Sequence, residues 1–97
     1  MNKQGVLTKL SEHADEIRKR FSVKAISIFG SIVRDEAGDD SDVDVLVTFE
    51  HKATFDGFMD LKFYLEELLG RRVDLVTENA LRPRMRRAIQ EELIRVA

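Results

Sequence analysis

One segment, DVDVLVTF at residues 42–49, places two carboxylates in a run that otherwise has the composition of a β-strand. Side chains alternate across a strand, so Asp42 and Asp44 are expected on one face and the valines of the segment on the other. Two carboxylates that lie this close repel each other, and one tends to stay protonated unless a cation bridges them. The segment therefore predicts a strand with one apolar face and one face that carries chemistry.

The chain has 97 residues, a length that suits one small domain, so we expect residues 1–97 to form a single domain. Its apolar content of 43% and charged content of 35% are typical of a soluble globular protein. We see neither an apolar run that spans a bilayer nor an apolar leader, and we therefore expect a cytoplasmic protein with no membrane partner. The absence of cysteine excludes disulfides and thiol catalysis. A net charge of −2 argues against direct binding of nucleic acid.

Apolar periodicity and turn residues predict the order α-β-α-β-α-β-α, which indicates an α/β (or α+β) domain with a three-strand sheet covered by helices. The strands are expected at 23–30, 42–49 and 72–77. The helices are expected at 7–21, at 31–37, between Thr54 and Gly70, and from Pro83 onward. The GDDS segment at 38–41 reads as a polar turn.

Two helices are expected to bury apolar stripes. In the third helix the stripe includes Phe55 and Phe58, which follow the Thr54 cap. The stripe of the last helix is formed by Met85, Ile89, Leu93 and Val96.

Gly30 and Ser31 follow the first predicted strand and suggest a phosphate site. A glycine at a strand end lets backbone approach a ligand, and the N-terminus of a following helix offers N–H groups to an anion. Asp74 interrupts a third strand, and it would join Asp42 and Asp44 if the strands are neighbours. Three carboxylates suit Mg²⁺ or Mn²⁺. A phosphate site beside a metal site is what phosphoryl or nucleotidyl transfer requires, so these features together predict such a reaction.

The segment GSIVRDEAGDDSDVD resembles the pattern G-S-x10-D-x-D of nucleotidyltransferases of the DNA polymerase β superfamily. The short chain and the form GSxxR…SDxDxLV resemble the minimal nucleotidyltransferase (MNT) family in particular. The resemblance covers essentially the whole chain, because RRVDLVT and RPRMRRAI also look like that family's ending. It implies a nucleotidyltransferase fold with a mixed sheet and flanking helices, which binds ATP through two divalent ions, Mg²⁺ or Mn²⁺.

The resemblance also implies a role for each residue of the motif. Asp42 and Asp44 would bind the metal ions, and Asp74 would be the third metal-site carboxylate that helps to activate the attacking hydroxyl. Arg34 matches the arginine common after the glycine-serine turn, and Asp35 stands where family members often have glycine. The expected catalytic and metal residues are Asp42, Asp44 and Asp74, and the expected nucleotide-binding residues are Gly30, Ser31 and Arg34.

The implied activity is Mg²⁺-dependent transfer of AMP, or another nucleoside monophosphate, from a nucleoside triphosphate to a hydroxyl. Members of this family are commonly paired with HEPN-domain proteins, and some act as antitoxins by adenylylating a toxin tyrosine, so a HEPN-type partner is expected. The alternative is a non-catalytic subunit that masks a partner protein, and the three carboxylates favour the enzyme. Two points stay open: whether the chain forms a homo-oligomer, and whether its last helix presents a solvated face or a cationic rim. The arginines of that helix region are Arg82, Arg84, Arg86 and Arg87.

Overall fold

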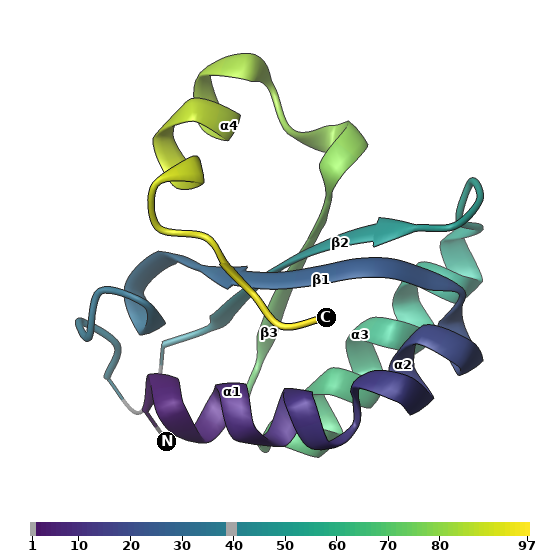
Figure 1. Ribbon diagram of the computed structural model, residues 1–97, viewed down its shortest axis with the longest axis horizontal. Helices are drawn as coiled ribbons and strands as arrows, with labels where there is room; N and C mark the ends of the chain where they lie inside the picture. Colours follow the sequence, from purple (N-terminus) through teal and green to yellow (C-terminus); the bar gives the residue numbers. More distant parts are fainter. Residues whose placement is uncertain (1, 39–40) are drawn as a thin grey trace.

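The computed structural model describes residues 2–38 and 41–97, so the expected turn at 38–41 includes two residues, Asp39 and Asp40, that lie outside the described part. Within the described ranges, four strands form one sheet in the order β3-β2-β1-β4 (Figure 1). Strand β1 is antiparallel to β2 and to β4, whereas β2 and β3 are parallel. The strands are β1 (Val23–Phe29), β2 (Val43–Phe49), β3 (Val73–Thr77) and β4 (Ile94–Arg95).

Helices cover the two faces of the sheet unequally. Three of them, α1, α2 and α3, lie on one face, and α4 stands alone on the other (Figure 1). Two short 3₁₀ helices, η1 and η2, follow β1 and β3. The bounds are α1 (Lys3–Glu12), α2 (Ala14–Phe21), η1 (Gly30–Ile32), α3 (Phe55–Leu69), η2 (Glu78–Ala80) and α4 (Pro83–Gln90).

The main core lies between the sheet and the three-helix layer. Val43, Val45 and Val47 are fully buried there, as the alternation of β2 predicts. They share this core with Leu61 and Leu65 of α3. Complete burial of one such side chain stabilises a fold by about 1.5–3 kcal/mol. A smaller apolar cluster lies on the opposite face, where Phe29, Leu81 and Ile89 are buried and Leu46 and Val76 are only partly buried.

The expected caps of α3 and α4 are confirmed. The Thr54 hydroxyl accepts a hydrogen bond from the Gly57 N–H at 3.0 Å, and Gly70 ends α3 with a φ of 66°. Pro83 is the first residue of α4, where its missing N–H costs nothing. Among the described helices, none is both long and apolar enough to cross a membrane.

Three expectations about the helices are wrong. The predicted helix at 7–21 is broken at His13, whose φ of −110° and ψ of 10° are not helical and whose N–H bonds to the Leu10 carbonyl. Phe55 is not inward: it is the first residue of α3 and is 76% exposed. Met85 is likewise 50% exposed, because α4 touches the sheet through little more than Ile89.

The expectation of three strands is also wrong, because the end of the chain adds β4. Leu93 and Val96 were expected in the last helix, but α4 ends at Gln90. The following backbone instead pairs with the free edge of β1, where the Val96 N–H donates to the Ile26 carbonyl at 2.8 Å. The hydrogen bonds available at an open sheet edge therefore override a helical pattern of apolar residues.

Candidate functional site

The candidate site forms where β1 ends and where β2 and β3 begin. In the sheet register, Asp44 lies opposite Phe29 of β1 and beside Asp74 of β3. Gly30 follows Phe29 directly. The strand order thus brings Gly30, Asp44 and Asp74 together, although they are far apart in the sequence. Because Asp44 alternates with the buried valines of β2, it lies on the α4 side of the sheet.

The Asp44 carboxyl is held in an unfavourable environment for its charge. Burial, then the charge of Asp74 and a hydrogen bond with it, and then the charge of Asp42, raise the pKa of Asp44 to about 6, which Arg34 partly opposes. A carboxyl with this pKa is mostly ionised at pH 7 and takes up a proton as the pH falls through about 6. A divalent cation at this position would favour the ionised form.

Gly30 makes room for that carboxyl. Its φ is +80°, and a Cβ atom built on it would lie 2.0 Å from Asp44 Oδ2. No side chain fits in that space, and the left-handed backbone itself favours glycine. Gly30 is therefore required by the close approach of its backbone to Asp44.

The segment after Gly30 differs from the expected helix at 31–37. Only a three-residue 3₁₀ helix forms, and Ser31 lies inside it rather than at its N-cap. The Val33 and Arg34 N–H groups both point back to the Gly30 carbonyl, at 3.0 and 3.3 Å. The helix ends at Ile32, and Asp35, in the turn that follows, adopts a φ of 59°. The expected helix N-terminus that would bind an anion is therefore not formed. The donors that remain for an anion are the loop backbone, the Ser31 hydroxyl and Arg34.

Asp42 lies just before β2 and pairs with an arginine. Arg72 Nε is 3.2 Å from Asp42 Oδ1, and both side chains are largely exposed. As the described side chains stand, no group of three or more His, Cys, Asp or Glu is arranged to hold a metal ion. Asp44 and Asp74 face each other, as expected, but the third carboxylate is engaged by Arg72.

A residue that the sequence analysis missed, Glu92, joins this region from the end of the chain. Its Oε1 accepts a hydrogen bond from the Gly30 N–H at 3.0 Å, and its Oε2 accepts one from Arg34 Nη1 at 2.8 Å. Arg34 Nε also donates to Glu36 at 2.9 Å. The hydrogen bonds to Glu36 and Glu92 raise the pKa of Arg34, so it stays charged. No local pattern could indicate Glu92, because 62 positions separate it from Gly30.

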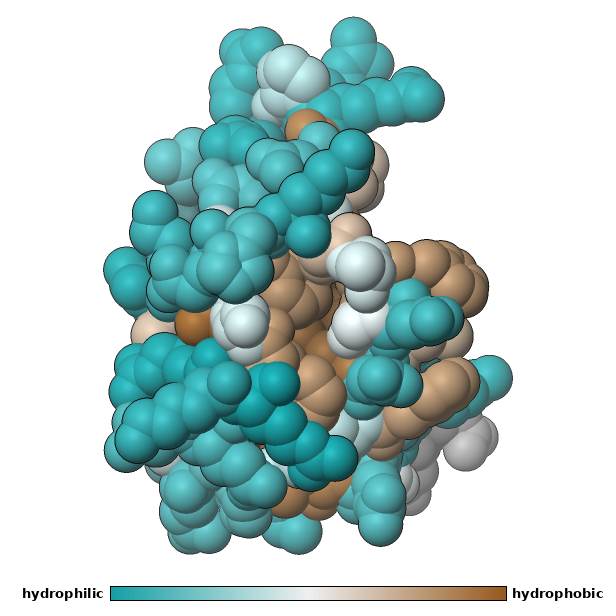
Figure 2. All heavy atoms as spheres, turned by 90° about the vertical axis from the view of Figure 1, so that its right-hand side faces the viewer, coloured by the Kyte–Doolittle hydropathy of each residue, from teal (hydrophilic) through white to brown (hydrophobic). Residues whose placement is uncertain are grey.

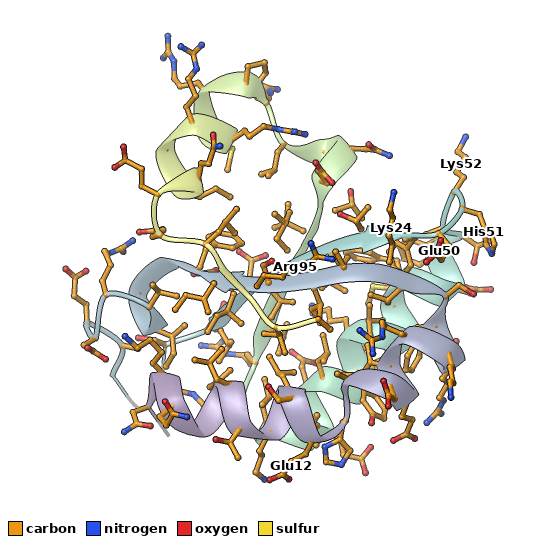
Figure 3. The ribbon with its side chains drawn as sticks, viewed as in Figure 1. Glu12, Lys24, Glu50, His51, Lys52 and Arg95 are labelled. Atoms are coloured by element: carbon orange, nitrogen blue, oxygen red, sulfur yellow. The ribbon has the colours of Figure 1, made fainter. Side chains whose placement is uncertain are left out.

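Asp42 and Asp74 of the candidate site are exposed, and the two larger hollows of the described part of the chain lie away from it. A hollow of about 840 Å³ lies elsewhere, between α2 and α3, and one of about 550 Å³ lies between the ends of β2 and β3. None of the six expected site residues lines either hollow. Glu50, His51 and Lys52 border the second hollow, at the opposite end of β2 from η1 (Figure 3). Figure 2 shows this side of the molecule, with hydrophilic residues over α4 and apolar residues in the hollow below.

The chain is similar over most of its length to known nucleotidyltransferases. Residues 10–96 match the family described as nucleotidyltransferase domain. The protein adenylyltransferase MntA of Thermococcus cleftensis is 46% identical over 87 residues, which cover 90% of this chain and 88% of the relative. A solved structure described as a minimal nucleotidyltransferase is 39% identical and superposes with a TM-score of 0.81, covering 97% of this chain and 95% of the other.

A more distant match concerns a two-protein complex. A chain of the solved complex of tri-AMPylated Shewanella oneidensis HEPN toxin with MNT antitoxin superposes with a TM-score of 0.68. It covers 94% of this chain and 71% of the other, and at 15% identity the likeness shows the fold alone. The motif resemblance and the mixed-sheet fold are confirmed: the chain belongs to the minimal nucleotidyltransferase family, has the polymerase β-like fold and is a nucleotidyltransferase.

Proposed function

We propose that this nucleotidyltransferase moves AMP from ATP to a tyrosine hydroxyl of a HEPN-type partner protein, and so acts as an antitoxin. The observation that carries the proposal is that Gly30, Asp44 and Asp74 lie together at one end of the sheet, where β1 ends and β2 and β3 begin. Two relatives support it. The 46% identical MntA is a protein adenylyltransferase, and an MNT antitoxin forms a complex with an AMPylated HEPN toxin.

We assign the divalent ions, Mg²⁺ or Mn²⁺, to Asp42, Asp44 and Asp74. The donor chemistry fits, because these are oxygen ligands and because a cation favours the ionised form of Asp44, whose pKa is raised by burial and by the neighbouring carboxylates. When bound, the ions would neutralise charge on the attacking and leaving oxygens of an in-line displacement. To bind a metal ion, Asp42 must break its ion pair with Arg72.

The remaining residues bind and orient the reactants. Gly30, Ser31 and Arg34 hold the β and γ phosphates, so the α phosphorus lies toward the carboxylates. The partner's hydroxyl oxygen forms a bond to the α phosphorus, and the bond between that phosphorus and the oxygen of the departing pyrophosphate breaks. Asp74 is exposed beside Asp44 and accepts the proton from the hydroxyl.

The acceptor side of the site is supplied by the partner, because the described residues do not enclose it. Helix α4 stands on the same face of the sheet as Asp44 and is almost entirely exposed (Figure 1). Arg86 pairs with Glu78 at 3.1 Å, and Arg84 and Arg87 of the same helix are exposed. An acidic-faced partner would dock here and place its tyrosine at the carboxylates.

Co-expression with a HEPN-type protein tests the proposal. We expect a complex that weakens at high salt and a partner that gains the mass of AMP on a tyrosine. The Asp44→Asn variant should form the same complex and leave the partner unmodified. A tight complex without added mass, in the presence of ATP and Mg²⁺, would instead support the non-catalytic masking subunit. Modification of a small alcohol in place of a protein would refute the partner assignment.

A further inference from the structure

Glu92 contacts two of the three residues that the proposed function assigns to phosphate binding. One carboxylate oxygen takes the Gly30 N–H at 3.0 Å and the other takes Arg34 Nη1 at 2.8 Å. The glutamate side chain is 20% exposed, compared with 46% for Arg34. A single half-buried carboxylate therefore links the Gly30 backbone to the more exposed Arg34 side chain.

The backbone of Glu92 is itself held in place. Its N–H donates to the Ile89 carbonyl at 3.0 Å, at the end of α4. Two residues later β4 begins, and its residues pair with Ser27 and Ile28 of β1, just before Gly30. Glu92 is thus fixed on both sides relative to η1 and can serve as an anchor.

An exposed arginine without such an anchor samples many rotamers. Ordering a long charged side chain costs conformational entropy, and a group that is already oriented avoids most of that cost on binding. Arginine has more N–H donors than its bonds to Glu36 and Glu92 use, so others remain for a phosphate. Arg34 is also close enough to lower the pKa of Asp44, which places its charge at the carboxylate site.

We propose that Glu92 is a positioning residue, which acts through Arg34 and the Gly30 turn to preorganise the phosphate side of the site. This inference rests on the proposed function. It assigns to the end of the chain a part in nucleotide binding that no feature of the glycine-serine or aspartate motifs indicates.

A double-mutant cycle tests it by calorimetric titration of ATP in the presence of Mg²⁺. We expect Glu92→Ala to weaken ATP affinity about tenfold, as does the loss of one charge-assisted hydrogen bond. Glu92→Gln should recover part of the loss, because its amide oxygen still accepts from Gly30. In an Arg34→Ala background, Glu92→Ala should have a clearly smaller further effect, because only the contact with the Gly30 N–H is left to lose. Glu91→Gln is the matched control, since it removes a charge from the adjacent exposed residue, and should change nothing.

Turnover of the partner provides a second readout. Glu92→Ala should raise KM for ATP more than it lowers kcat, and thermal melts should show that Glu92→Gln stays folded. Unchanged affinity in Glu92→Ala, or equal losses with and without Arg34, would overturn the positioning role. Tighter binding would overturn it too, and would show that Glu92 competes with phosphate. If the wild type binds no ATP, both the proposed function and the positioning role fail. If the wild type binds ATP and the Glu92 variants bind it equally well, only the positioning role fails.

Discussion

The two faces of β2 have opposite properties. The valines on the helix-covered face are fully buried, whereas Asp44, Leu46 and Thr48 on the α4 face are only partly buried. The second face combines the small apolar cluster with polar contacts: Thr48 donates to Glu78 at 2.7 Å, and Glu78 pairs with Arg86 of α4. Because side chains alternate along β2, one face stabilises the core and the other carries the candidate site. Mutations on the first face should therefore reduce stability, and mutations on the second should reduce activity.

The largest effect is expected from Asp44→Asn, and we expect Asp42→Asn to behave alike. Each change removes a proposed metal ligand, so AMP transfer should fall by about a thousandfold or more, while the fold is kept. Val45→Ala on the opposite face is the matched control. It should cost about 2 kcal/mol of stability and leave the activity of the folded protein intact. Radiolabelled AMP transfer and thermal melts distinguish the two, and an Asp44→Asn variant that unfolds would mean that the aspartate is structural.

Two glycines sharpen the comparison further. Gly30→Ala should reduce transfer at least about a hundredfold, because the new Cβ collides with the Asp44 carboxylate 2.0 Å away. Gly70→Ala is an ideal control: its φ of +66° imposes similar backbone strain, but nothing lies within 4 Å of its Cβ position. It should lose about 1 kcal/mol of stability and no activity. Equal activity losses in the two variants would show that strain, and not the collision, matters.

The raised pKa of Asp44 predicts a pH effect on the metal-free protein. Because the pKa rises from 3.8 to about 6 on folding, its stabilising contribution is complete below pH 3.8 and is lost as the pH increases through about 6. At pH 7 in chelator, Asp44→Asn should therefore be more stable than wild type by about 1 kcal/mol, a value reduced for partial exposure. Denaturant unfolding should show this difference shrinking toward pH 4. A difference that is constant with pH would contradict the assigned pKa shift.

The smallest effect concerns Asp35, in the turn that follows η1. Asp35 adopts a φ of 59°, which is unfavourable for a residue with a Cβ. Asp35→Gly should therefore stabilise the protein by about 0.5–1 kcal/mol with activity unchanged, as measured by thermal unfolding. The same substitution at Glu36, which does not have a left-handed backbone, should not stabilise the protein. Destabilisation by Asp35→Gly would show that the Asp35 side chain contributes contacts that outweigh its strain.

Local patterns predicted most of the fold. Alternation in β2, the Thr54 and Gly70 caps and Pro83 at the start of α4 fix elements through short-range physics, and the structure confirms them. The sequence could not indicate β4, because its pairing depends on an open edge of β1 that only the assembled sheet presents. The break at His13 also escaped prediction, since the apolar spacing continues through it.

The site divides in the same way. The spacing of Gly30, Asp42 and Asp44 is a local signal, and the register of β2 with β3 places Asp74 where neighbouring strands were expected to bring it. Their chemical roles stay predictions. The contacts of Glu92 with Gly30 and of Arg72 with Asp42 join distant parts of the chain, and single polar residues at such separations carry no periodic signal.

Calorimetric titration of ATP into the isolated chain, with Mg²⁺ and with chelator, tests the central claim most directly. The carboxylate face repels a triphosphate unless a cation intervenes, so we predict binding with Mg²⁺ and little or none without it. The Asp44→Asn variant should lose most of this metal dependence. Equal ATP affinity in both conditions would contradict the account, because the open face of β2 would then bind nucleotide without the metal that its carboxylates are proposed to hold.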